Sequence, residues 1–190
     1  MVAALVPTLD GTAIRVGSVA VPNASLEDHW ASGPARSEVA SGGWDVVVMQ
    51  QGPSSLPESR VNLIEWAGRF ADEARAGGAR PALLTVWPSE GRAAFFGDVV
   101  ASYAAAADAS GSALYPAGAA WQAAREAGTV DPYGPDRFHP SPAGTYLAAL
   151  VVAGGLTGET TVGLPALGVV DAATARALQE QADAALAAVE

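Results

Sequence analysis

The sequence contains neither cysteine nor lysine. A chain without cysteine cannot form disulfides, thiolate metal ligands or a thiol nucleophile. All 10 basic residues are arginines, spread from Arg15 to Arg176 without a cluster, and with 20 acidic residues they give a net charge of −10. Nucleic-acid binding needs a concentrated basic surface. We therefore expect no nucleic-acid partner.

Long apolar segments are also lacking. No apolar run reaches the roughly 20 residues that cross a bilayer, so we expect no membrane span. No basic segment followed by an apolar stretch marks a secretion signal. The chain is nevertheless 50% hydrophobic over 190 residues, which predicts a single domain, residues 1–190, with a hydrophobic core. The oligomeric state and a cytoplasmic or secreted location stay open.

The acidic residues show no metal-binding pattern. Glu27, Asp28 and His29 are adjacent in the sequence, and neighbouring side chains on a helix point in different directions. We therefore expect no metal site and no cofactor.

Short β-rich runs alternate with helical patterns along the chain. The runs are nearly continuous in apolar residues, which is typical of parallel strands buried on both faces. The predicted strands are Ala13 to Val21, Asp45 to Gln50, Pro81 to Trp87 and Ser112 to Tyr115. The predicted helices are Met1 to Leu9, Glu58 to Ala76, Ala93 to Ala109, Ala119 to Ala127, Pro142 to Ala153 and Ala172 to Val189, the last within a C-terminal segment 171–190 capped by Asp171. The alternation predicts a three-layer α/β fold with a parallel sheet, and Gly154 to Gly168 reads as a loop.

The stretch D-R-F-H-P-S-P places a histidine three residues after an acid. Pro140 keeps His139 in extended backbone, and Ser141 can cap the helix that follows. Asp136 can accept the Nδ1 proton of His139 across the turn, which leaves Nε2 free to act as a base. The alternative is a surface turn with an incidental Asp–His hydrogen bond.

A second stretch, W-D-V-V-V-M-Q-Q-G-P-S-S, ends a strand with uncharged donors. In open α/β folds the carboxyl ends of the strands host ligands. Gln50 and Gln51 could stabilise a developing oxyanion without titrating, and Gly52 allows a close approach of the backbone. An ordinary strand-to-helix loop is the alternative.

A third stretch, V-P-N-A-S-L-E-D-H-W, follows the first predicted strand. Asn23 tolerates unusual backbone angles and could present its N–H group inward. Ser25 and Asp28 have the spacing of a capping box. We expect His29 to be structural.

Together these stretches resemble the SGNH hydrolases, also called GDSL-type esterases. The run from Asp136 to Leu147 resembles the terminal D-x-x-H element of that superfamily, and Trp44 to Ser55 resembles its third element. Pro22 to Trp30 and Tyr115 to Trp121 are similar to elements of a bacterial subgroup. The resemblance covers roughly residues 1 to 157.

The resemblance implies a flavodoxin-like sheet and hydrolysis of small carboxylic esters, often acetyl esters of carbohydrates. It makes His139 the base and Asp136 its orienting carboxylate. Gln51 is the expected oxyanion donor, aided by backbone N–H groups near Asn23 or Gly52. A different register would instead put Ser54 in that role.

The nucleophile of the superfamily is absent from this sequence. It lies in a G-D-S or G-N-S element directly after the first strand, whereas Ser18 falls inside a predicted strand and not on an exposed turn. A parallel α/β unit normally starts with a strand, but Met1 to Leu9 has helical spacing. We expect that the native protein extends upstream and there supplies the first strand and its serine; a helix that simply opens the domain is the alternative.

Two other functions remain open. A non-catalytic binding module of the same fold could hold a sugar or acyl ligand, with Trp87, Trp121 and Tyr133 lining its cleft or packing in the core. A flavodoxin-like or receiver-like signalling domain fits less well, because the chain has no lysine and no G-x-G-x-x-G loop.

Overall fold

A computed structural model describes residues 1–11 and 13–189; Thr12 and Glu190, which belong to the predicted domain 1–190, lie outside the described residues. The chain divides into two compact units. The strand unit comprises Gly17–Val86 and Gly97–Leu114, and the helical unit comprises Met1–Val16, Trp87–Phe96 and Tyr115–Glu190. The single domain stays a prediction.

The sheet confirms three of the predicted strands. Its strands are β1 (Val46–Met49), β2 (Arg80–Leu84) and β3 (Ala113–Tyr115), in the order β1-β2-β3. β1 and β2 run parallel, with Val46 opposite Arg80 and Met49 opposite Leu83. The apolar runs therefore identified these strands correctly, although each strand is shorter than expected.

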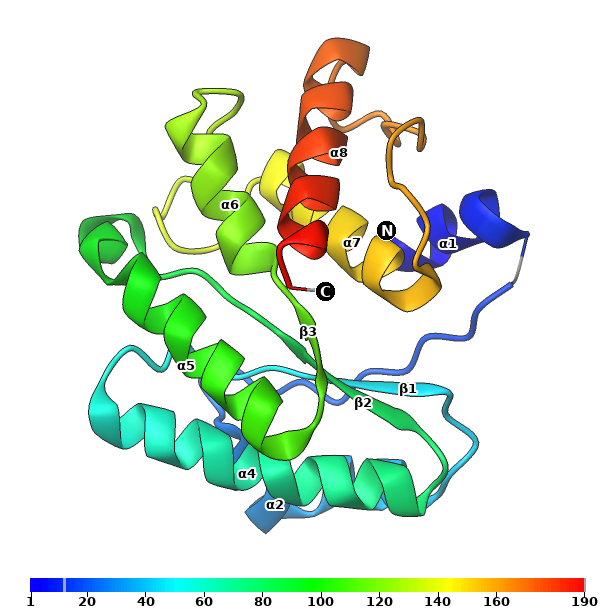
Figure 1. Ribbon diagram of the computed structural model, residues 1–190, viewed down its shortest axis with the longest axis vertical. Coiled ribbons are helices and arrows are strands. Elements are labelled where there is room, and N and C mark those ends of the chain that lie inside the picture. The colour runs from blue at the N-terminus through cyan, green and yellow to red at the C-terminus, as the bar shows by residue number, and fades with distance from the viewer. Residues whose placement is uncertain (12, 190) are drawn as a thin grey trace. The chain divides into compact units, whose positions relative to one another are not determined.

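Four helices complete the strand unit: α2 (Leu26–Ser32), α3 (Pro34–Ala40), α4 (Pro57–Ala76) and α5 (Phe96–Ser110). In Figure 1, α4 and α5 lie on the same side of β1 and β2. Their apolar faces share one core with the strands, which includes Met49, Leu63, Phe70, Leu83, Val99 and Tyr103. Burial of these side chains is the main force that holds the unit together.

The predicted strand Ala13 to Val21 is wrong. The described residues of this segment form no strand, and Val16, Val19 and Val21 are 60%, 39% and 54% exposed. Valines favour a strand only where another strand takes the backbone hydrogen bonds and covers the side chains, and here none pairs with them. The segment instead passes close to Trp44, because a Cβ on Gly17 would lie 2.5 Å from the Trp44 ring.

The helical unit packs around α7 (Pro142–Thr157). Its other helices are α1 (Val2–Asp10), α6 (Ala117–Glu126) and α8 (Ala172–Ala187), and each of them contacts α7. A 3-10 helix, η1 (Glu90–Phe95), precedes α5. The predicted helix Ala93 to Ala109 is therefore wrong at its start, since regular α-helix begins only at Phe96.

The predicted loop Gly154 to Gly168 is wrong in its first four residues, which belong to α7. Gly154 and Gly155 serve close packing there and not a turn. A Cβ on Gly154 would lie 2.6 Å from a methyl carbon of Leu186, and one on Gly155 would lie 2.5 Å from the Tyr115 ring. The helix ends only at Gly158, whose φ of 74° suits a left-handed cap.

Within the part of the chain that the structure describes, no helix combines the length and apolar character needed to cross a membrane.

Close packing at Gly144, in the first turn of α7, can be tested against a matched glycine. A Cβ at this position would lie 2.2 Å from the Pro132 carbonyl oxygen and 2.8 Å from the Trp121 ring, whereas Gly68 in α4 has open space. Gly144→Ala should lower the free energy of unfolding by about 1–3 kcal/mol, and Gly68→Ala should raise it by up to about 1 kcal/mol. Urea denaturation measures both, and an equal effect of the two substitutions would contradict this packing.

Candidate functional site

The Asp–His pair of the D-x-x-H stretch lies in the helical unit. His139 Nδ1 donates to Asp136 Oδ2 at 2.5 Å, and Asp136 Oδ1 accepts from the backbone N–H groups of Phe138 and His139 at 3.1 and 2.9 Å. The hydrogen bond from the His139 side chain, with these two backbone bonds, lowers the pKa of Asp136 to about 2. The carboxylate therefore stays charged at neutral pH.

The imidazole is open to solvent. The His139 side chain is 74% exposed and that of Asp136 53%. Among the described residues, the structure gives the ring one hydrogen-bond partner, the Asp136 carboxylate. Because the Asp136 carboxylate can only accept a hydrogen bond, Nδ1 keeps its proton and Nε2 is the unprotonated nitrogen of the neutral ring.

A small closed loop holds the pair. Tyr133 and Pro140 form an isolated antiparallel bridge, and the Gly134 N–H donates to the His139 carbonyl at 2.7 Å. Ser141 caps α7 by accepting from the Gly144 N–H at 3.1 Å, which confirms the predicted cap. The loop therefore leads directly into a stable helix end.

The segment from Trp87 to Glu90 forms hydrogen bonds with this loop. Trp87 Nε1 donates to the Phe138 carbonyl at 3.0 Å, and the Tyr133 hydroxyl donates to the Pro88 carbonyl at 2.7 Å. The Glu90 N–H donates to the Arg137 carbonyl at 2.9 Å.

The three aromatic residues considered for a ligand cleft stack on one another. Trp87 and Trp121 are parallel with centroids 3.6 Å apart, and Tyr133 meets Trp121 edge-on at 5.1 Å. Trp121 and Tyr133 are 0% and 4% exposed. For these two residues the core-packing interpretation is therefore correct. Their buried rings pack against each other beneath the loop that carries the Asp–His pair.

The amides after β1 lie in the strand unit. Gln51 is buried; its Oε1 accepts from the Leu26 N–H at 2.9 Å and its Nε2 donates to Ser54 Oγ at 2.9 Å. The Ser54 hydroxyl in turn donates to the Gly52 carbonyl at 3.1 Å. The structure thus brings Gln51, Gly52 and Ser54 together, whereas Gln50 points to solvent.

Tyr103 of α5 fixes the backbone of this turn. Its hydroxyl donates to the Gln51 carbonyl at 2.6 Å and accepts from the Gln51 N–H at 3.1 Å. Burial raises the pKa of Tyr103 well above its usual value, so the hydroxyl remains a neutral donor. Ser54 adopts a left-handed φ of 55° within the same turn.

The turn before α2 agrees with its sequence pattern. Asn23 is exposed with φ at 60°. Ser25 and Asp28 form the predicted capping box, with Asp28 N–H donating to Ser25 Oγ at 3.2 Å and Ser25 N–H to Asp28 Oδ2 at 2.8 Å. The backbone bond from Ser25 lowers the pKa of Asp28. His29 is 9% exposed, as expected for a structural residue.

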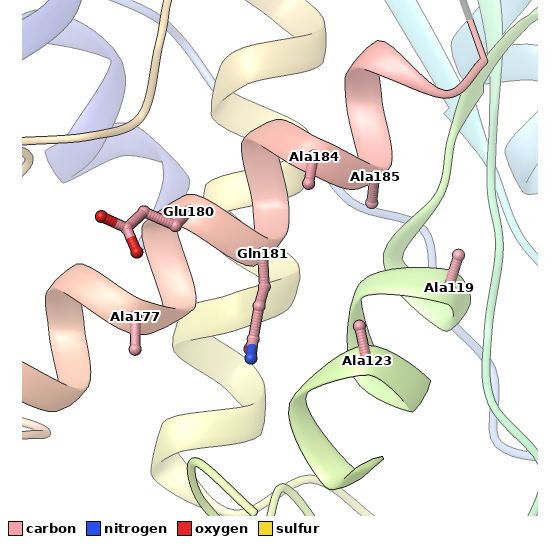
Figure 2. A pocket seen from close by; sticks show the side chains of 7 residues that line it. All are labelled: Ala119, Ala123, Ala177, Glu180, Gln181, Ala184 and Ala185. Carbon is pink, nitrogen blue, oxygen red and sulfur yellow. The ribbon is translucent and has the colours of Figure 1, made fainter. Parts of the chain in front are cut away.

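In the part of the chain that the structure describes, neither a cluster of metal-ligating side chains nor the hollow between α6 and α8 adds to these two groups. Among the described residues, no three His, Asp or Glu side chains come close enough to hold a metal ion. A hollow of about 390 Å³ lies between α6 and α8, but its walls are mainly alanines with Glu180 and Gln181 (Figure 2). None of the predicted site residues lines it.

Sequence reasoning missed Arg137 and Glu90, which contact the Asp–His loop through side chains and backbone. Arg137 lies inside the D-R-F-H motif, so the sequence places it beside the Asp–His pair but does not show which residue it binds. Its partner is 47 residues away in the sequence, and no pattern links the two.

The Asp136 hydrogen bonds predict a pH effect on stability. Its folded pKa of about 2 lies below the ordinary value of 3.8, so its stabilising contribution is complete above pH 3.8 and is lost as the pH falls towards 2. The free energy of unfolding of the wild type should exceed that of Asp136→Asn at neutral pH, and the difference should shrink in acid. Denaturation series at several pH values measure this, and a difference independent of pH would contradict the assignment.

The buried amide of Gln51 predicts a contrast with its neighbour. Gln51→Leu leaves the Leu26 N–H without its partner, and an unsatisfied buried group costs about 1–3 kcal/mol. Gln50→Leu changes an exposed side chain and should shift the free energy of unfolding by no more than about 0.5 kcal/mol. Urea denaturation compares the two, and similar losses would show that Gln51 does not link α2 to this turn.

Two solved structures resemble the chain, while neither the known protein families nor the curated proteins give a match. One is a DUF4886 family protein from Bacteroides uniformis ATCC 8492, with a TM-score of 0.69 and 21% identity over 80% of this chain. The chain spans 66% of that protein, just under two thirds of its length. The other is described as "a putative SGNH hydrolase" from Slackia heliotrinireducens, with a TM-score of 0.59 and 29% identity over 70% of this chain and 79% of that one. With its parallel α/β sheet, the chain therefore has the fold of the SGNH hydrolases.

Proposed function

We propose that the chain carries the base and the oxyanion donor of a serine ester hydrolase of the SGNH type. The observation that carries the proposal is the Asp136–His139 pair, in which Nδ1 is bonded to a carboxylate and the ring is exposed. In this arrangement Nε2 accepts the proton of a serine hydroxyl as that serine attacks an ester carbonyl. The same nitrogen then returns the proton to the leaving alcohol.

The surroundings of the pair support catalysis over an incidental surface contact. Both oxygens of Asp136 are used, one by the ring and one by two backbone N–H groups. An isolated exposed ion pair contributes little to stability, so stability alone gives little reason to hold the imidazole in one orientation. Fixing the tautomer of a base is a use that this geometry serves well.

We assign the oxyanion donor to Gln51. Its Nε2 carries two hydrogens, and one of them goes to Ser54 Oγ. The second hydrogen is our candidate donor, assisted by backbone N–H groups at Gly52 or Asn23. Ser54 suits the role less well, because its hydroxyl proton is given to the Gly52 carbonyl. The substrate class is a small carboxylic ester, such as the acetyl ester of a carbohydrate.

We further propose that the nucleophilic serine follows a strand, outside these 190 residues, that pairs with the free edge of β1. Among the described residues, β1 pairs with β2 along one edge and with no strand along the other. In the strand unit, Gly17 lies beside Trp44, just before β1, and the Leu26 N–H donates to Gln51, just after β1, so the two ends of segment 17–26 lie near the two ends of β1. The exposed Val19, Val21 and Val48 would be covered by a strand at this edge.

Such a strand would end on the same side as β1 if it ran parallel to it. Its carboxyl end would then fall near the level of Gln51, the second residue after β1. Nucleophiles in α/β folds occupy turns at this edge of the sheet. The proposal therefore places the serine near its oxyanion donor.

Ester turnover tests the proposal. The 190-residue chain should not hydrolyse 4-nitrophenyl acetate, whereas the product of the gene read from the nearest upstream in-frame start should do so. In that longer protein, His139→Ala should lower kcat/KM by about 10²–10⁴-fold. Asp72→Asn, which alters an exposed carboxylate on α4, should leave kcat/KM unchanged.

Two outcomes would overturn this function. Turnover that survives His139→Ala would remove the base from the mechanism. No turnover by either protein, together with binding of a sugar ester, would favour the non-catalytic binding module.

A further inference from the structure

Arg137 has an unusual backbone conformation at a sensitive position. It lies between the two members of the Asp136–His139 pair, and its φ is 58°. A residue with a Cβ loses about 1–2 kcal/mol in the left-handed region. Such a conformation persists only where the surrounding structure imposes it.

The guanidinium group of Arg137 supplies that constraint. Its Nε and Nη2 donate to the two carboxylate oxygens of Glu90 at 2.7 and 2.5 Å, and its Nη1 donates to Asp131 at 2.6 Å. This paired geometry fits an arginine fork, and a lysine cannot reproduce it. At the backbone, Glu90 N–H also donates to the Arg137 carbonyl.

The same contacts leave Arg137 little capacity for a substrate. Its three nitrogens already face two carboxylates, and its hydrogen bond is the main cause of the lowered pKa of Glu90. The guanidinium also lies over the Tyr133 ring, 5.5 Å from its centroid. These bonds use three of the five N–H groups of the guanidinium, and two carboxylates already balance its charge. The group is therefore built to hold the loop.

We propose that Arg137 and Glu90 are positioning residues, which hold the backbone between Asp136 and His139 in the conformation that keeps the imidazole oriented. This inference rests on the proposed function, because it gives the pair a reason to be held. The Phe138 and His139 N–H groups reach Asp136 Oδ1 only across the turn that Arg137 forms. If Arg137 leaves the left-handed region, these N–H groups turn away and the carboxylate loses the bonds that fix it.

The pKa of the Asp136 carboxyl depends on the hydrogen bonds of this turn, and it can be measured without a substrate or a nucleophilic serine. Arg137 is not among the causes of its low pKa, which come from His139 and Phe138. A change in its titration therefore reports a rearranged turn and not a lost neighbouring charge. ¹³C NMR of the 190-residue chain can follow the titration, and hydrogen exchange can follow the Phe138 and His139 amides.

Three substitutions make the test specific. Arg137→Lys keeps the charge but loses the fork, and Glu90→Gln keeps the shape but loses the charge. Arg176→Lys is the matched control, because Arg176 pairs with Glu180 on α8 in the same unit. In the first two variants the pKa of Asp136 should rise from about 2 towards 3.8, and the His139 amide should exchange at least about 10-fold faster, which corresponds to about 1.4 kcal/mol. The control should match the wild type.

Folding is checked by near-ultraviolet circular dichroism and by the ring signals of His29, the other of the two histidines. Folded variants in which Asp136 titrates and His139 exchanges as in the wild type would overturn the positioning role. That result is independent of ester turnover, so a failure of the proposed function and a failure of this inference can be told apart.

Discussion

A β-strand needs a neighbouring strand to form hydrogen bonds with its backbone. This requirement determines which apolar segments of the strand unit form strands and which do not. β1, β2 and β3 satisfy one another and share a core with α4 and α5. The valine-rich segment from Ala13 to Val21 has the composition of a strand but forms no strand, and its valines are exposed. A valine-rich composition therefore favours a strand, but the strand forms only where a neighbouring strand can pair with it. The same requirement underlies our proposal that one more strand pairs with the edge of β1 that no described strand occupies.

Each half of the proposed site is organised within its own unit. The Asp136–His139 pair depends on its own turn, on the Tyr133–Pro140 bridge and on the segment from Trp87 to Glu90. Gln51 depends on Leu26, Ser54 and Tyr103. Neither group needs the other to reach its own geometry. Substitutions in one half should therefore leave the local geometry of the other half unchanged.

Much of the fold could be predicted from the sequence because its signals are local. Continuous apolar runs identified three strands, and the spacing of Ser25 and Asp28 identified a capping box. The D-x-x-H stretch located the Asp–His pair, since a turn of three residues fixes the distance between its members.

The missed features depend on distant contacts. Gly154 and Gly155 are helical because Leu186 and Tyr115 pack against them, and nothing in their own segment shows this. The role of Arg137 depends on Glu90, 47 residues earlier. Helix α3 was missed because it is short and has no side-chain cap; it starts from Gly33, whose φ is 99°.

One measurement tests most directly whether His139 serves a serine nucleophile. The gene product extended upstream of Met1 is treated with a fluorophosphonate probe, and peptide mass spectrometry locates the label. The account predicts a label on one serine upstream of Met1 that follows an apolar strand, and loss of that label in His139→Ala. A label on a serine within residues 1–190, or a label that His139→Ala leaves intact, would contradict it.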